Sequence, residues 1–416
     1  MAVKQSARIL IMNRTGFKYL ILTIALLTIQ RILVKWYPPI GLVLAVVALL
    51  FFSIHLLKSK KQYSLNNIDR SSRLLIFILI VYSLSIVLRG FPNMQNHQIS
   101  PIGYFTHALF ITPYFLPFIA IYTFSARNIK TLLKVSNILA IIFIIYAIIC
   151  WKDILQLNSI GLAHFTNKVG EEYNSSIFTF YAELTSLCAP FVIFLIQDYI
   201  PKKYHKIATI NIVIAFIIAV IAGRRTSTFT IGLVFIAYYF LIYKKKTSGT
   251  IKILFITFTA IIILYNSGLL DFFISKIDNE SRLGVEESFI ADMDYTSWII
   301  GRGALGSYFD IGFTYSNPYR TEIETGYLYL ILKGGIIYLI IYVTVLLRAF
   351  YLGYFKSNNT FTKAFACLAL ICCIELIPFG VPMLNIKFFS LWLGVGICLN
   401  KRIRALSNED IKAILN

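Results

Sequence analysis

Apolar runs of about twenty residues recur along almost the whole chain, and this repetition constrains the fold more than any other feature. A helix needs about 20 apolar residues to cross the hydrocarbon core of a bilayer. Each run is predicted to be a helix, because a lone strand in lipid would leave its backbone groups unpaired. The sequence therefore predicts an all-α, polytopic integral membrane protein with about 12 transmembrane helices. The runs are 18–35, 38–57, 73–90, 104–124, 131–150, 176–197, 206–222, 226–243, 251–270, 323–347, 362–377 and 383–400.

The composition supports this class, and the chain 1–416 is predicted to be a single membrane domain. Only 14% of its residues are charged, against about 25% in soluble domains. Four basic residues precede the first run, and no small-residue cleavage site follows it. We therefore expect a retained first span rather than a cleaved signal peptide.

The distribution of lysine and arginine predicts the orientation. The net charge of +20 could suggest a nucleic-acid partner, but 26 of the 39 lysines and arginines fall in alternate segments between the runs. That bias is the positive-inside pattern, so both termini are predicted to be cytoplasmic and no nucleic acid is expected. The basic segments are 1–18, 58–73, 127–134, 198–206, 244–252, 348–363 and 401–416.

This orientation places one large polar loop, 271–322, outside the membrane between helices 9 and 10, and a smaller one at 151–175. The large loop holds nine of the 19 acidic residues and four basic ones. Its sequence Ile300-Gly-Arg-Gly-Ala-Leu-Gly-Ser surrounds Arg302 with glycines. Glycine permits positive φ, so the segment is either an anion-binding backbone nest or a plain turn. The excess of acids is unexpected for an anion site, unless they pair with the loop's own arginines or face away.

Further arginines and carboxylates lie at the predicted outer boundary. Arg224 and Arg225 occupy a short connection where positive charge is disfavoured. They either reach the headgroups as long side chains at a helix end or bind phosphate oxygens through their guanidinium forks. Glu322 and Glu324 lie at the start of the next helix. Either they cap that helix, since its dipole favours carboxylates at the N-terminus, or one of them acts as a general base. Arg282 and Arg320 are the loop's other candidate phosphate ligands.

Three charged residues lie inside apolar runs, where charge is costly and often marks function. Glu183 and Glu375 lie nearer the outer ends, and each either faces a cavity or pairs with a base, for which Arg89, Arg224, Arg225 and Lys387 are the candidates. Lys333 is predicted to lie close to mid-membrane as a supporting residue, lining a groove or pairing with a buried glutamate.

No metal or cofactor is expected. The six cysteines lie in apolar runs or at their ends, and none has a histidine at metal-ligand spacing. They are predicted to be small buried hydrophobic residues.

Arginines and a carboxylate at a membrane boundary suit a lipid-linked diphosphate as substrate. Arginines would stabilise the charge that develops on a diphosphate leaving group. A carboxylate would deprotonate an acceptor hydroxyl, a contribution of about 10² to 10⁴ in rate. We assign Arg302, Arg320 and one or both of Arg224 and Arg225 to the diphosphate, and Glu324 to the hydroxyl, with Glu322 as the alternative base.

Two segments carry a resemblance to a known family. Gly223-Arg-Arg-Thr-Ser and Glu324-Thr-Gly-Tyr-Leu-Tyr-Leu-Ile-Leu-Lys-Gly-Gly, together with the topology, resemble bacterial O-antigen polymerases and ligases. In the ligases the helix start reads His-Asn-x-Tyr-Leu. Here Tyr327 and Leu328 align, so Tyr327 joins the supporting residues, but Glu324 replaces the histidine, which favours the polymerases.

The resemblance implies a metal-independent glycosyltransferase at the outer face of the bacterial cytoplasmic (inner) membrane. It would join undecaprenyl-diphosphate-linked oligosaccharide repeat units into O-antigen, capsule or exopolysaccharide. A ligase that transfers finished polymer to a lipid core, and a polysaccharide flippase or transporter, are the alternatives. The sequence leaves open whether a chain-length regulator takes part.

Overall fold

The computed structural model describes ten segments of the chain, and these are mostly helical. The prediction of an all-α membrane protein is confirmed at this level, with one short pair of strands as the exception. The predicted run 251–270 lies outside the described residues. The described segments are 16–33, 38–58, 67–90, 110–121, 126–149, 191–221, 225–242, 282–310, 318–378 and 380–415.

The helices follow the apolar runs closely. In chain order they are α2 (Gly16–Leu33), α3 (Pro38–Lys58), α4 (Arg70–Gly90), η2 (Thr112–Ile121), α6 (Ala126–Ile149), α9 (Phe191–Leu195), η3 (Gln197–Tyr199), α10 (Lys202–Ile221), α11 (Arg225–Ile242), α14 (Arg282–Asp292), α15 (Tyr295–Ile300), α16 (Gly326–Phe355), α17 (Thr360–Glu375), α18 (Ile386–Leu399), α19 (Lys401–Ala405) and α20 (Asn408–Leu415). The strands β1 (Tyr308–Phe309) and β2 (Tyr319–Arg320) pair antiparallel.

Three of the described helices are long and apolar enough to cross a membrane: α4, the part of α6 from Asn128 to Ile145, and α16. Five shorter apolar helical segments accompany them in the described residues. These helices indicate a membrane protein. The number of spans and their orientation stay predictions.

Two predicted boundaries differ from the structure. The run 104–124 contains a 3-10 helix, η2, with Pro117 inside it, where the missing N–H of proline removes one backbone hydrogen bond. The run 323–347 was predicted to end before Arg348, but α16 continues to Phe355. The predicted inner segment 348–363 therefore begins inside a helix.

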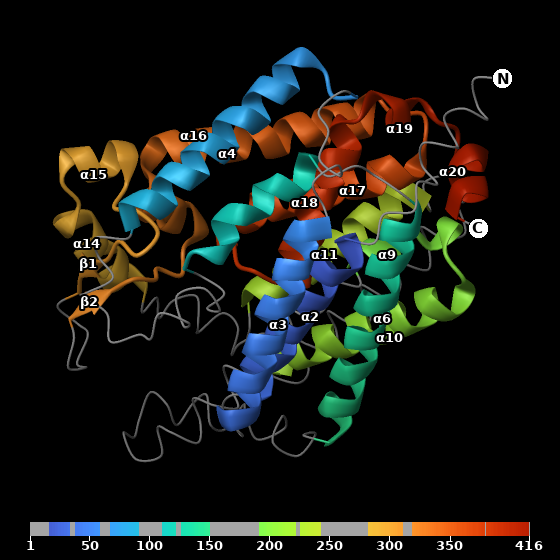
Figure 1. Cartoon of the computed structure of the whole chain (residues 1–416), viewed down its shortest axis with the longest axis horizontal. Helices are drawn as coiled ribbons and strands as arrows, with labels where there is room; N and C mark the ends of the chain where they lie inside the picture. The colour runs from blue at the N-terminus through green and yellow to red at the C-terminus, as the bar shows by residue number, and fades with distance from the viewer. Residues whose placement is uncertain are drawn as a thin grey trace, which may run out of the picture.

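The helices α4 and α16 lie side by side and antiparallel along the long axis of the molecule (Figure 1). Arg348 of α16 binds Asp69 just before α4, while Tyr82, further along α4, binds Gly334 of α16. The helices α2 and α3 pack against each other and lie at a steep angle to α16 (Figure 1). The helices α14 and α15 and the two strands lie together at one end of the molecule. The C-terminal helices α19 and α20 lie toward the other end.

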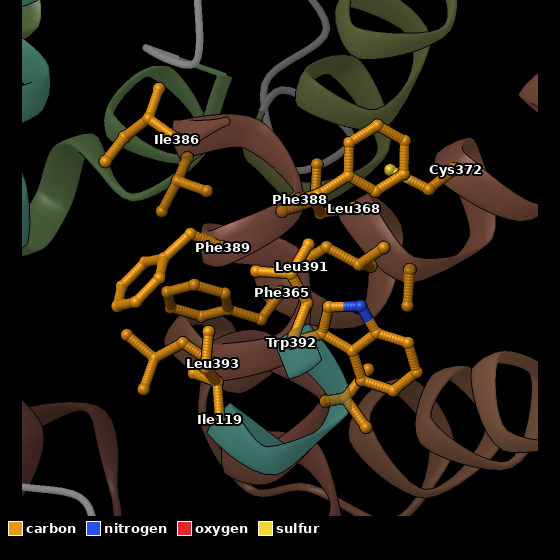
Figure 2. Packing of buried hydrophobic residues seen from close by; sticks show 14 of the residues in the cluster. Ile119, Phe365, Leu368, Cys372, Ile386, Phe388, Phe389, Leu391, Trp392 and Leu393 are labelled. Atoms are coloured by element: carbon orange, nitrogen blue, oxygen red, sulfur yellow. The ribbon is translucent and has the colours of Figure 1, made fainter. Parts of the chain in front are cut away.

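The main core lies where α17, α18 and η2 meet (Figure 2). Trp392 of α18 packs there with Phe365 of α17 and Ile119 of η2, and all three are at most 5% exposed. Both α17 and α18 are apolar on nearly every side, which is the pattern of a helix enclosed by protein. Of the cysteines in the described residues, Cys367, Cys372 and Cys398 are buried and Cys373 is half-buried, in line with their predicted packing role.

The helix α16 is broken at Gly335, where φ is 72° and ψ is 179°, a conformation essentially restricted to glycine. After the break, large apolar side chains are exposed from Ile336 to Phe355, a length of about 30 Å, close to the hydrocarbon thickness. Before it, Tyr327 is the one large hydrophobic residue of α16 that is exposed. The long exposed apolar face of α16 thus follows Lys333 in the chain, and the depth of Lys333 in the membrane stays a prediction.

Candidate functional site

The part of the large polar loop that the structure describes packs on the first half of α16 around a small hydrophobic core of its own. Phe289 of α14 and Tyr308 of β1 are fully buried there, with their rings 5.5 Å apart and edge to face. Leu328, Tyr329 and other residues from the start of α16 complete this cluster. The loop is therefore a folded cap at the start of α16, and its core fixes the positions of the polar residues around it.

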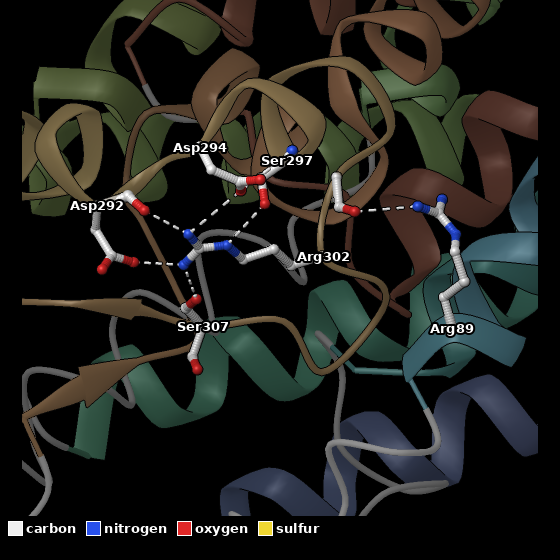
Figure 3. A network of polar contacts seen from close by, with 7 residues as sticks. Arg89, Asp292, Asp294, Ser297, Arg302 and Ser307 are labelled. Atoms are coloured by element: carbon white, nitrogen blue, oxygen red, sulfur yellow. Dashed lines mark hydrogen bonds and ion pairs between the residues drawn. The ribbon is translucent and has the colours of Figure 1, made fainter.

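Arg302 holds this cap together (Figure 3). Its Nη1 donates to the Asp292 carboxylate and, at 2.8 Å, to the Ser307 carbonyl oxygen. Its Nη2 donates to the Asp292 carbonyl oxygen and its Nε to Ser297 Oγ at 3.1 Å, while Asp294 lies 3.9 Å from Nη2. Every nitrogen of the guanidinium has a protein partner. These contacts give Arg302 a structural role in the cap, and it would have to leave Asp292 in order to bind a diphosphate.

The glycines around Arg302 adopt positive φ, 74° at Gly301 and 83° at Gly303. The backbone N–H groups of Arg302 and Gly303 donate to the carbonyl oxygens of Leu332 and Lys333, at 2.8 and 2.9 Å. Those carbonyls have lost their helical partners because α16 breaks two residues later. The amides of this turn are therefore occupied, and the segment joins the cap to the broken helix rather than forming an open anion nest.

Two residues of α4 secure the same junction. The hydroxyl of Tyr82 donates to the Gly334 carbonyl oxygen at 2.8 Å. The Nη1 of Arg89 donates to the carbonyl oxygens of Ile300 and Gly301. The sequence did not reveal these contacts, which join positions more than 200 residues apart.

Arg320 is the second arginine of the cap with a carboxylate partner. It lies opposite Tyr308 in the strand pair, and its Nη1 is 3.0 Å from Oδ2 of Asp310. Asp310 is 3% exposed, so this pair lies largely away from water. With the Arg302–Asp292 pair, it shows that two acids of the loop bind the loop's own arginines.

Glu322 is exposed to solvent and has two basic neighbours, Lys333 and Arg320. The residue is exposed, yet protein surrounds its carboxyl group closely enough that desolvation raises its pKa, while the nearby charges of Lys333 and Arg320 oppose that rise. Lys333 is fully buried and donates to the Gly306 carbonyl oxygen at 2.8 Å. It lines no open groove. It anchors the cap beneath Glu322.

Glu324, the residue assigned as the base, is exposed two positions further on. Thr325 next to it is the N-cap of α16, and its hydroxyl donates to the Glu286 carboxylate of α14. Tyr327 is 37% exposed, and its backbone N–H donates to the Leu376 carbonyl oxygen at 3.2 Å. The start of α16 is therefore tied to α14 on one side and to the end of α17 on the other.

The end of α17 contains the buried ion pair of the described bundle. Glu375 accepts hydrogen bonds from Lys387 of α18 and, at 3.0 Å, from the Thr230 hydroxyl of α11. Of the candidate partners for Glu375, the structure selects Lys387. Thr230 lies five residues after Arg225, the first residue of α11, so the start of this helix lies about 7–8 Å from Thr230 along the helix axis. The contacts of Glu375 and Leu376 thus bring the starts of α11 and α16 to one end of the bundle.

Several predicted residues are placed by the backbone alone or not at all. Arg225 and Arg282 are the first residues of α11 and α14, and nothing is described of their side chains. Arg224 and Glu183 lie outside the described residues.

The structure adds to the site three acidic residues that the sequence alone does not single out, namely Asp292, Asp310 and Glu286. Asp292 and Asp310 each lie ten residues from the arginine they bind, a separation that signals nothing without the turn between them. Within the described residues, no group of three or more metal-ligating side chains is close enough to hold a metal ion. Comparisons with protein-family models, curated proteins and solved structures find no match to this chain.

Proposed function

We propose that the protein is a polymerase of oligosaccharide repeat units carried on undecaprenyl diphosphate, acting at the outer face of the bacterial cytoplasmic membrane. The observation that supports it best is the setting of Glu322. An accessible carboxyl group with a raised pKa lies beside Arg320 and Lys333, at the boundary where α16 meets its cap. A raised pKa makes a carboxylate a stronger base, and nearby cations keep it ionised.

In the proposed reaction the acceptor hydroxyl oxygen attacks the anomeric carbon of the growing chain. The bond from that carbon to the diphosphate oxygen breaks, and the lipid diphosphate leaves with the electron pair. Glu322 takes the hydroxyl proton, with Glu324 as the alternative base. Cationic groups stabilise the leaving diphosphate. The start of α11, with Arg224 and Arg225, is the better candidate for that role, because Arg302 and Arg320 are committed to Asp292 and Asp310.

The test uses the purified full chain in liposomes supplied with lipid-linked repeat units. Glu322→Gln is expected to lower polymer formation by about 10²- to 10⁴-fold, the contribution of a general base. Glu287→Gln removes an exposed acid of α14 and serves as the matched control, with activity retained. Loss of polymer in Glu324→Gln, with Glu322→Gln active, would move the base to Glu324.

One observation bears on the transporter alternative. Broken membrane helices are common in transporters, where freed carbonyls bind ions. In α16 the freed carbonyls of Leu332, Lys333 and Gly334 already accept hydrogen bonds from the cap and from Tyr82, which favours a fixed structural break. Movement of the lipid-linked unit across the liposome membrane without polymer formation would refute the polymerase.

A further inference from the structure

An arginine without a partner lies at the opposite end of the molecule. Arg404 belongs to the short helix α19 and is only 9% exposed. Its Nε atom is buried and has no hydrogen-bond partner among the described residues, and no ion pair reaches its side chain there. A buried hydrogen-bond donor without an acceptor is costly. Such an arrangement indicates a binding site whose anion is not part of the protein.

The segment around Arg404 is well fixed by its backbone. Its carbonyl oxygen accepts a hydrogen bond from the Asn358 N–H at 2.9 Å, and the neighbouring Lys401 N–H donates to the Asn67 carbonyl oxygen at 2.9 Å. A bridge between Ile68 and Asn400 joins α19 to the residues before α4. Arg404 is therefore held in place next to the start of α4 by contacts that do not involve its own charge.

A second arginine and one acid lie close to Arg404. The guanidinium of Arg348 binds Asp69 Oδ2 at 3.3 Å and the hydroxyls of Ser71 and Ser72 at 3.0 and 3.3 Å. Asp69 and Arg348 are near enough to Arg404 to act on its charge, and burial lowers the pKa of Arg404. Asp69 also caps the Ser72 N–H at 3.0 Å, so its Oδ2 is already fully used.

The surrounding surface is strongly cationic. Four exposed basic residues flank these three groups, two in the first turn of α4 and two in α19, namely Arg70, Arg73, Lys401 and Arg402. With Arg348 and Arg404 they outnumber Asp69, the one acid among these seven residues. Clustered cations of this kind attract an anion and raise its local concentration.

We propose that Arg404 and Arg348 form a binding site for a phosphate group, supplied either by the headgroup of an anionic lipid or by free phosphate. Guanidinium groups bind phosphate through parallel hydrogen bonds, and Arg404 has the free donor for this contact. The site is separate from the proposed catalytic end and does not depend on the polymerase activity.

The competing explanation is that Arg404 pairs with Asp69, whose Oδ1 is also buried without a partner. The two explanations differ for Asp69→Asn, which keeps an N-capping side chain but removes the acid. A phosphate site would bind more tightly in this variant, because a like charge has gone. An Arg404–Asp69 pair would instead leave the unaltered protein without phosphate binding, and binding would appear only when Asp69→Asn frees Arg404.

The test uses the full chain in neutral detergent, with native mass spectrometry for lipid adducts and thermal unfolding for free phosphate at constant ionic strength. Phosphatidylglycerol and phosphatidylcholine are compared, together with inorganic phosphate against chloride. Arg404→Gln is expected to weaken phosphate or phosphatidylglycerol binding by about tenfold or more. Arg402→Gln removes an exposed charge from the same helix and is expected to bind nearly as the unaltered protein does.

Preference for phosphatidylglycerol over phosphatidylcholine identifies a lipid headgroup, and stabilisation by inorganic phosphate alone identifies a free anion. Both support the site if Arg404→Gln removes the effect. Equal loss in Arg402→Gln would reduce the effect to diffuse attraction and overturn the proposal. If Arg404→Gln does not fold, binding in the unaltered protein decides: no lipid or phosphate preference there, or a preference that appears only in Asp69→Asn, refutes the site.

Discussion

Replacing Gly335 by alanine tests whether the break in α16 depends on the docked cap. At φ 72° and ψ 179° an alanine is strained by about 1–3 kcal/mol. Its Cβ would also lie 2.0 Å from the Ile299 carbonyl oxygen, so the cap must shift. That shift would break the hydrogen bonds from the Arg302 and Gly303 amides to α16, at about 1 kcal/mol each. The expected destabilisation is about 3–5 kcal/mol.

Thermal unfolding in detergent, followed by circular dichroism, measures the overall loss. Hydrogen exchange at 299–306 shows whether the cap has come away from α16. Gly232→Ala in α11 is the matched control, since a Cβ there meets nothing within 4 Å. It is expected to be neutral or to stabilise by up to about 1 kcal/mol. Normal stability and unchanged exchange in Gly335→Ala would refute the reasoning, as would equal damage from Gly232→Ala.

Three further predictions follow from the polar contacts. Glu375→Gln or Lys387→Met alone leaves a buried group unpaired and should cost about 3–5 kcal/mol, while the double variant should cost much less; additive losses in a double-mutant cycle would contradict the pairing. Arg302→Lys keeps the charge but loses the fork to Asp292, and should destabilise the cap by about 2–3 kcal/mol, measured as faster proteolysis within 282–310. Because burial raises the pKa of Glu322, polymer formation should fall with decreasing pH earlier than for an ordinary glutamate. By the same linkage, its ionisation costs stability above the raised pKa, and the cost vanishes below the pKa of the unfolded chain. Glu322→Gln should therefore unfold no more easily than the unaltered protein at neutral pH.

The sequence predicted the helices well, because a chain in lipid has little choice of secondary structure. The runs 38–57 and 206–222 became Pro38–Lys58 and Lys202–Ile221. Predicted and observed ends differ by a few residues, since polar residues at a helix end are compatible with either state. The helix α16 ends eight residues after the predicted end, because Arg348 resembles the basic residues that follow a membrane-spanning run. Its partner Asp69 lies 279 positions away, and nothing near Arg348 in the sequence indicates that it is paired within the bundle.

The site was predicted less completely, and the reason differs between residues. The pair Gly334-Gly335 is visible in the sequence, but a positive φ at Gly335 arises only when the segment after Ile299 docks against it. The partner of Arg302 cannot be predicted from the sequence, because any of the loop's nine acids could neutralise an arginine. The partner is selected by the fold of α14 and α15 rather than by sequence spacing.

The two ends of the molecule differ in whether their arginines have acidic partners, rather than in how many arginines they contain. At the cap, Arg302 and Arg320 are held by Asp292 and Asp310, so the charges of these two arginines are neutralised within the loop and stabilise its fold. A diphosphate at that end must draw on cations whose charge is not already matched, which directs attention to the start of α11. At the other end, Arg404 is buried, and no acid of the described segments is bound to it. An external anion therefore gains the most binding free energy at Arg404. If each arginine is replaced in turn, the change at Arg404 should weaken anion binding, while the change at Arg302 should lower the stability of the cap.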